Sequence, residues 1–135
     1  MDSSKCSLLK SKLASCPEPQ FVSIDEFFDG NDDEGSIGCN LWPNHPGIAA
    51  FRETLATLAA RHDVDQVVIE INEADPGADD WPFSDVVYVA GAVPELTLQS
   101  LLSPLAPDEV AEMPAHDAPP YLQRISSPIF RVWWD

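Results

Sequence analysis

The sequence has very little positive charge. Its 135 residues contain seven Lys and Arg against 23 Asp and Glu, a formal net charge of −16 at pH 7. Lysine is absent after Lys12, and from Gln20 onward 21 acidic residues face only four arginines. Such a charge repels nucleic acid and anionic membranes, and it attracts cationic protein surfaces. We therefore expect a basic protein as the partner, and neither nucleic acid nor a membrane.

Cysteines and long apolar runs are also scarce. Cys6, Cys16 and Cys39 form an odd set without a CxxC pair, which favours reduced thiols in a cytoplasmic protein. No apolar run approaches the ~18 residues that a membrane-spanning helix needs. GxSxG, P-loop and GxGxxG motifs are missing as well, so we expect no catalytic residue and no cofactor.

The length and composition fit one domain with a preceding arm. Hydrophobic residues make up 44% of the chain, enough for a core at this size. The first prolines after the N-terminus are Pro17 and Pro19, and prolines break regular structure. We expect a helical arm over residues 1–19, with a helix over 3–15 that turns Leu8, Leu9 and Leu13 inward, and a single α+β domain over 20–135.

Hydrophobic periodicity predicts the elements of that domain. The predicted strands are 21–24, 36–41, 66–72, 85–89 and 129–134, and the predicted helices are 46–62 and 94–103. A further turn is expected at 107–110 and coil at 113–120. This order is typical of an antiparallel sheet with two main helices on one face, as in the ferredoxin-like βαββαβ plan.

Glu70 stands out among the acidic residues because apolar residues flank it on both sides in a predicted strand. Alternation places Val67, Ile69 and Ile71 on the face that the helices cover, and Glu70 on the opposite face. A raised pKa is one interpretation of this position, and an ordinary solvent-facing glutamate is the other. We include Glu70 among the candidate partner-binding residues.

The most acidic loop, residues 25–34, has oxygen-bearing side chains at alternating positions, as calcium sites do. The EF-hand template does not fit, because position 6 counted from Asp29 is Glu34 rather than glycine, and position 12 is Asn40 rather than glutamate. An irregular calcium loop and a solvated acidic loop both remain open. The three histidines have no metal-ligand spacing, and we assign no metal ligands.

Two acidic loops carry the other candidate contacts with a basic partner. Aromatic side chains supply desolvated contact area at protein interfaces, and surrounding charges steer the association. The 73–84 loop is too long for a tight hairpin, so we expect it to protrude with an exposed or half-buried tryptophan; at least one of the four tryptophans should be exposed. The candidates are Asp32, Asp33 and Glu34 in the first loop and Asp79, Asp80 and Trp81 in the second.

Three segments of the sequence resemble a family of short, uncharacterised bacterial proteins. They are Phe27–Asp33, Gly35–Leu41 and Trp81–Asp85, the last followed by a Val/Tyr strand. The resemblance implies a bacterial origin and a compact domain, and it transfers no site. In size and acidity, the chain is also similar to immunity proteins that neutralise cationic toxins.

These observations favour a non-catalytic protein-binding domain that neutralises a basic partner, most of all an immunity protein or inhibitor of a bacterial toxin. The alternatives are an acidic accessory or adaptor domain with another partner, and a small metal-binding protein that uses the loop from Asp25 to Glu34. Adaptation to high salt would also explain the loss of lysine after residue 12.

Overall fold

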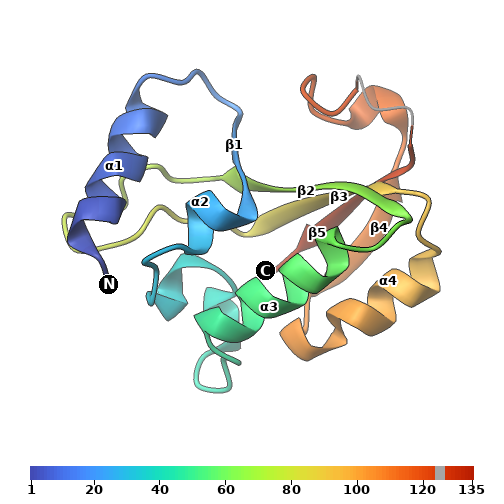
Figure 1. Cartoon of the computed structure of the whole chain (residues 1–135), viewed down its shortest axis with the longest axis horizontal. Helices are drawn as coiled ribbons and strands as arrows, with labels where there is room; N and C mark the ends of the chain where they lie inside the picture. The colour runs from blue at the N-terminus through green and yellow to red at the C-terminus, as the bar shows by residue number, and fades with distance from the viewer. Residues whose placement is uncertain (124–126) are drawn as a thin grey trace.

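A computed structural model describes residues 1–123 and 127–135. The elements follow the chain from the N-terminal helix at one end of the molecule to strands at the other (Figure 1). They are α1 (Ser3–Ala14), β1 (Gln20–Val22), α2 (Ile24–Phe28), α3 (Ile48–Ala59), β2 (Val64–Ile71), β3 (Val86–Gly91), α4 (Glu95–Leu102), β4 (Glu109–Met113) and β5 (Ile129–Trp133).

The strands form one antiparallel sheet in the order β1-β2-β3-β5-β4, which confirms the predicted α+β class. The sheet order departs from the ferredoxin-like plan: β1 is an outer strand beside β2, and β4, where only a turn was expected, adds the opposite outer strand. β4 is an outer strand that pairs with β5 alone and carries two glutamates, Glu109 and Glu112. An edge strand of this kind buries little, so it has no hydrophobic alternation to reveal it.

Helices α3 and α4 lie against one face of the sheet (Figure 1). Val67, Ile69 and Ile71 of β2 point into the core on this side, as their alternation predicts. α3 contributes Phe51 and Leu55, which are fully buried. Its main hydrophobic stripe is confirmed. The helix begins two residues later than expected, because Gly47, at φ 101°, precedes its first turn.

The other face of the sheet is partly covered by residues 115–122. The sequence indicated residues 113–120 as coil, whereas Met113 ends β4 and Ala115–Asp117 forms a 3-10 turn. Ala118 and Leu122 pack there with Val68 and Tyr88 in a second, smaller cluster. Tyr88 is therefore buried rather than displayed to solvent.

The predicted strand over residues 36–41 is wrong. Two 3-10 turns, Glu34–Ser36 and Cys39–Leu41, replace it. Gly38 lies between them at φ 63°, and a Cβ there would approach Cζ of Phe51 to 2.7 Å. The left-handed conformation breaks the strand, and only Ile37 forms an isolated bridge, to Ser84.

Helix α1 packs beside the domain instead of on the sheet (Figure 1). Cys6, Leu9 and Leu13 are buried in the main core cluster, whereas Leu8 is 71% exposed and not turned inward as predicted. Asp2 caps the helix by accepting hydrogen bonds from the backbone N–H groups of Ser4 and Lys5. Within residues 1–123 and 127–135, no helix has the length and apolar character needed to cross a membrane.

Candidate functional site

An acidic pocket of about 280 Å³ lies between two loops, residues 31–36 and 73–84. Both loops hold predicted partner-binding residues, and the fold brings them together from 40 or more positions apart in the sequence. We call this cavity the acidic pocket. It is lined by Asp33, Gly35, Glu73, Pro76, Asp80, Trp81 and Phe83.

The two loops are joined by the carboxylate of Asp33. Its Oδ1 accepts a hydrogen bond from the N–H of Gly35 at 3.0 Å, and its Oδ2 accepts one from the N–H of Trp81 at 3.1 Å. A backbone hydrogen bond of 2.8 Å from Ser84 to Ser36 adds a second link. Asp33 therefore shapes the pocket as well as adding charge to it.

The far side of the pocket is held by a short two-stranded contact between Glu73 and Phe83. The N–H of Phe83 donates to the carbonyl of Glu73 at 2.8 Å, and the N–H of Glu73 donates back at 3.2 Å. The side chains of Glu73 and Phe83 consequently start from a fixed backbone. Since backbone hydrogen bonds set the positions of both loops, the pocket is preformed.

The pocket combines negative charge with an apolar wall. Asp33, Glu73 and Asp80 contribute three carboxylates, and Pro76 and Phe83 contribute apolar surface. In the described part of the chain, none of the three carboxylates has a basic group within 4.0 Å. An ammonium or guanidinium group on an aliphatic stem fits this combination, because the stem packs on apolar surface while the head meets the charge.

The acidic residues of the 25–34 loop do not converge on a metal site. Asp25 pairs with Arg52 at 3.2 Å, Asp29 pairs with Lys5 at 2.9 Å, and Asp33 is committed to backbone N–H groups. Over residues 1–123 and 127–135, no three His, Cys, Asp or Glu side chains lie close enough together to hold a metal ion. The geometry gives no support to the calcium-loop interpretation.

The predicted contact residues divide into three groups in space. Asp33, Asp80 and Trp81 line the acidic pocket, whereas Glu34 and Asp79 are exposed beside it. Asp32 lies near the start of α1. Its carboxylate forms an ion pair of 2.7 Å with the N-terminal amino group of Met1. Glu70 belongs to a separate surface on the sheet.

Trp81 is not exposed or half-buried, as its loop position predicted; it is 1% exposed and part of the main core cluster. The hydrogen bond from the backbone N–H of Trp81 to Asp33 holds the loop against the domain at this residue. Its indole Nε1 is buried without a hydrogen-bond partner among the residues that the structure describes. Trp81 is therefore a core residue although it lies in a charged loop, and the composition of the loop does not reveal this.

Glu70 lies on the helix-free face of the sheet beside Tyr88 and Arg131. Burial raises the pKa of Glu70, while the neighbouring Tyr88 and the charge of Arg131 oppose the rise. The guanidinium of Arg131 lies 5.4 Å from the ring centroid of Trp133. Of the two interpretations of Glu70, the half-buried glutamate with a raised pKa is the one that fits.

The comparisons with known proteins identify the family. A model of the family described as "Uncharacterized protein YfbO" matches residues 4–131. The chain belongs to the YfbO family. It is 31% identical over 122 residues to the uncharacterized protein YfbO of Escherichia coli strain K12, with 88% of this chain and 84% of the relative covered. No solved structure matches the chain.

The family assignment confirms the expected uncharacterised bacterial family. In this YfbO-family chain, the exposed tryptophan is Trp42, 75% of which faces solvent. It follows the 3-10 turn Cys39–Leu41, in a stretch without charged residues that leads to α3. The expectation of at least one exposed tryptophan is confirmed. We did not select Trp42 from the sequence, although its position between Leu41 and Pro43, outside any periodic segment, is a usable signal for a loop.

Proposed function

We propose that this chain is a non-catalytic protein-binding domain of the bacterial cytoplasm that neutralises a basic protein, in the manner of an immunity protein that occupies a toxin. The supporting observation is the acidic pocket: three carboxylates and an apolar wall, preformed and without a basic group within 4.0 Å in the described residues. The chain around it carries a net charge of −16. A lysine or arginine of the partner enters this pocket.

Two effects contribute to binding: long-range electrostatic attraction, and direct contact in the acidic pocket. The overall negative field raises the rate at which a cationic protein arrives, and salt screens this effect. The pocket then supplies a partly dry contact, where charged hydrogen bonds are stronger than in water. The proposal therefore predicts a salt-sensitive association rate and a 1:1 complex without turnover.

The test compares two variants with the same change in net charge. Glu73→Lys/Asp80→Lys reverses two carboxylates of the acidic pocket, whereas Glu109→Lys/Glu112→Lys reverses two on strand β4 at the sheet edge. Each tagged full-length chain is used to capture proteins from its bacterial host at low ionic strength. Captured proteins are quantified by mass spectrometry, and affinities are then measured with the purified partner.

We expect one basic protein to be retained by the wild type and by the β4 variant, and lost by the pocket variant. The affinity for the purified partner should fall at least tenfold in the pocket variant, about 1.4 kcal/mol of binding free energy. Equal retention by both variants, or the capture of no basic protein at low salt, contradicts the proposal.

A second candidate function is an accessory or adaptor domain that binds through an aromatic anchor. The exposure of Trp42 favours it, because tryptophans are enriched among the residues that dominate binding energy. For such an adaptor, Trp42→Ala reduces capture of the partner more than the pocket variant does, and added salt has little effect. The same capture experiment decides between the two functions.

A further inference from the structure

Helix α1 holds every lysine of the chain. Lys5, Lys10 and Lys12 all lie on it, and no acidic residue lies within Ser3–Ala14. The rest of the chain, from Gln20 onward, has 21 acidic residues and four arginines. Helix α1 therefore carries a net positive charge and packs next to a strongly negative domain.

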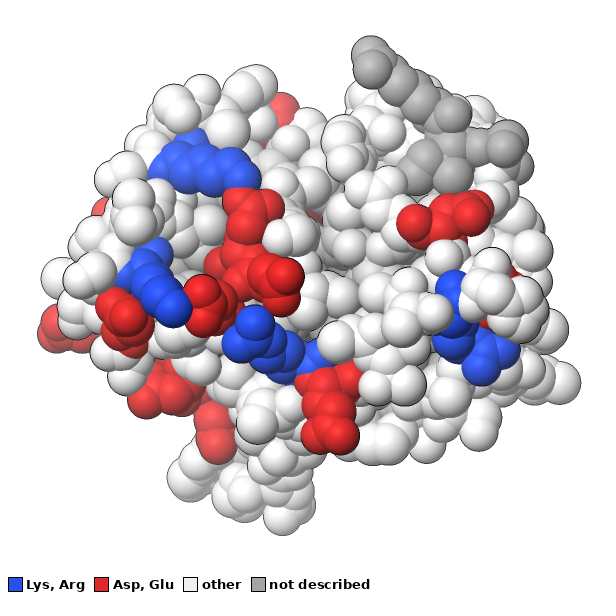
Figure 2. All heavy atoms as spheres, in the orientation of Figure 1, with Lys and Arg blue, Asp and Glu red and all other residues white. Residues whose placement is uncertain are grey.

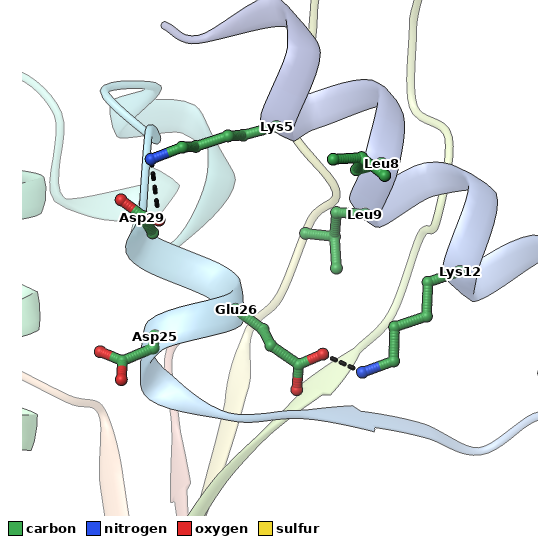
Figure 3. Close-up of a pocket in the computed structure, with 7 residues that line it drawn as sticks. All are labelled: Lys5, Leu8, Leu9, Lys12, Asp25, Glu26 and Asp29. Carbon is green, nitrogen blue, oxygen red and sulfur yellow. Dashed lines mark hydrogen bonds and ion pairs between the residues drawn. The ribbon is translucent and has the colours of Figure 1, made fainter.

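Each lysine of α1 is paired with that domain. On the side of α2, the Nζ of Lys5 lies 2.9 Å from Asp29, and Lys12 pairs with Glu26 (Figure 3). On the opposite side, Lys10 contacts the 73–84 loop: its Nζ lies 3.1 Å from Asp75 and donates to the carbonyl of Gly77 at 2.7 Å. On the face shown in Figure 2, basic side chains are interleaved with acidic ones where α1 and α2 lie.

Between these two rows of ion pairs runs an apolar stripe. Cys6, Leu9 and Leu13 follow the spacing of one helix face and are buried in the main core cluster. The Sγ of Cys6 is 3.6 Å from the carbonyl oxygen of Asp80, so the stripe reaches the loop of the acidic pocket. The surface beneath α1, formed by α2 and the 73–84 loop, therefore holds a basic helix through a narrow apolar stripe. We call this surface the α1 seat.

The contact between α1 and α2 leaves open space. A cavity of about 290 Å³ lies between the two helices, with Leu8 and Leu9 on one side and Asp25, Glu26 and Asp29 on the other. Figure 3 shows it bounded by the Lys5–Asp29 and Lys12–Glu26 pairs. The ion pairs that hold α1 here involve exposed side chains, which stabilise a contact only slightly.

We propose that the α1 seat is a binding surface for a basic amphipathic helix of the partner, and that α1 occupies it in the free protein. This inference rests on the proposed function, since it states how a basic partner is recognised. The chain's own helix has the required chemistry: lysines on both sides of an apolar stripe. Because α1 is tethered, it competes at a high effective concentration, and a partner helix must displace it.

The test uses a labelled synthetic peptide of residues 2–16 as the probe. Binding is measured by fluorescence anisotropy with the full-length wild type and with full-length Lys5→Glu/Lys12→Glu. In that variant, the α1 side chains repel Asp29 and Glu26, whereas the seat itself is unchanged. Hydrogen exchange of the α1 amides is recorded in the same samples, because it reports release of the helix.

Controls match the charge of each change. Lys12→Glu alone is compared with Arg61→Glu, which also breaks an ion pair, with Asp63, at the end of α3 away from the seat. If the double variant fails to fold, the comparison of the two single variants, Lys12→Glu and Arg61→Glu, provides the test. A third chain adds Glu26→Ala/Asp29→Ala to the double variant, which removes the two carboxylates that receive the peptide without restoring ion pairs to α1.

We expect the double variant to bind the peptide at least tenfold more tightly than the wild type, with weaker binding in high salt. Lys12→Glu should bind more tightly than Arg61→Glu, and the chain with Glu26→Ala/Asp29→Ala should bind at least tenfold more weakly than the double variant. Equal binding to wild type and variant, absence of binding, or unchanged protection of the α1 amides overturns the inference. These results leave the proposed function intact, because the pocket variants test that function without altering α1.

Discussion

Trp81 and Trp134 are two equally buried tryptophans that differ in one hydrogen bond. Each is 1% exposed and belongs to the main core cluster. The Nε1 of Trp134 donates to the carbonyl of Leu105 at 2.9 Å, whereas the Nε1 of Trp81 has no partner among the described residues. Replacing each by phenylalanine deletes the same atoms, so the loss of apolar burial is similar at the two sites.

The hydrogen bond decides the difference in stability. Trp134→Phe leaves the carbonyl of Leu105 buried and unpaired, which costs about 1–3 kcal/mol. Trp81→Phe instead removes a buried donor that is already unpaired, and this relieves a cost of about the same size. We therefore expect Trp134→Phe to lower the free energy of unfolding by at least about 2 kcal/mol more than Trp81→Phe.

The assay is urea denaturation followed by far-UV circular dichroism, which does not depend on tryptophan fluorescence. The free energy of unfolding is obtained by linear extrapolation, and equal slopes for all three chains confirm that the comparison is valid. An equal or larger loss of stability in Trp81→Phe would refute the assignment of Trp81 as a core residue with an unpaired N–H.

Two further predictions concern the sheet. Burial raises the pKa of Glu70 in the folded state, so the folded chain holds this proton more tightly than the unfolded chain, and the resulting stability is lost as pH rises through the folded pKa. Glu70→Gln should therefore be slightly more stable than the wild type at pH 7, with the gain vanishing below about pH 4, the range of an unperturbed glutamate; urea midpoints across pH check this, and a gain that grows toward low pH contradicts it. Gly91→Ala should destabilise the protein by about 1–3 kcal/mol, because its Cβ would lie 2.3 Å from the carbonyl oxygen of Asp63 and 2.8 Å from Cα of Val64. Gly35→Ala, whose Cβ meets only an Asp33 side-chain oxygen at 3.2 Å, is the control in the same denaturation assay, and equal losses at the two glycines would contradict the steric argument.

Strong periodicity made part of the fold predictable. The alternation of Val67, Ile69 and Ile71 and the stripe containing Phe51 and Leu55 correctly placed β2 and α3 against each other. These elements bury one face completely, so their apolar residues must follow the period of the backbone. Asp33 and Asp80, two of the acidic residues selected in these loops from the sequence, line one pocket. Their contact with a partner stays a prediction.

Periodicity did not predict the elements that bury few side chains, or the segments whose buried side chains lie in turns. β4 pairs on one side only, and its exposed glutamates carry no alternating pattern. The segment containing Ala118 and Leu122 covers the second face of the sheet through short turns, so no helix or strand period marks it. Whether a tryptophan on a loop is buried or exposed depends on tertiary hydrogen bonds, such as that from the backbone N–H of Trp81 to Asp33.

The amino-acid sequence by itself determined the excess of carboxylates, the confinement of lysine to the first 12 residues and the periodic elements of the core, because charge and periodicity are properties of the chain before it folds. Only the tertiary structure decided which charges meet. It set Lys5, Lys10 and Lys12 against acidic groups of α2 and the 73–84 loop, and it left the acidic pocket without a basic neighbour in the described residues. Such pairings depend on distances of a few ångströms between segments far apart in sequence, and those distances exist only once the core has packed.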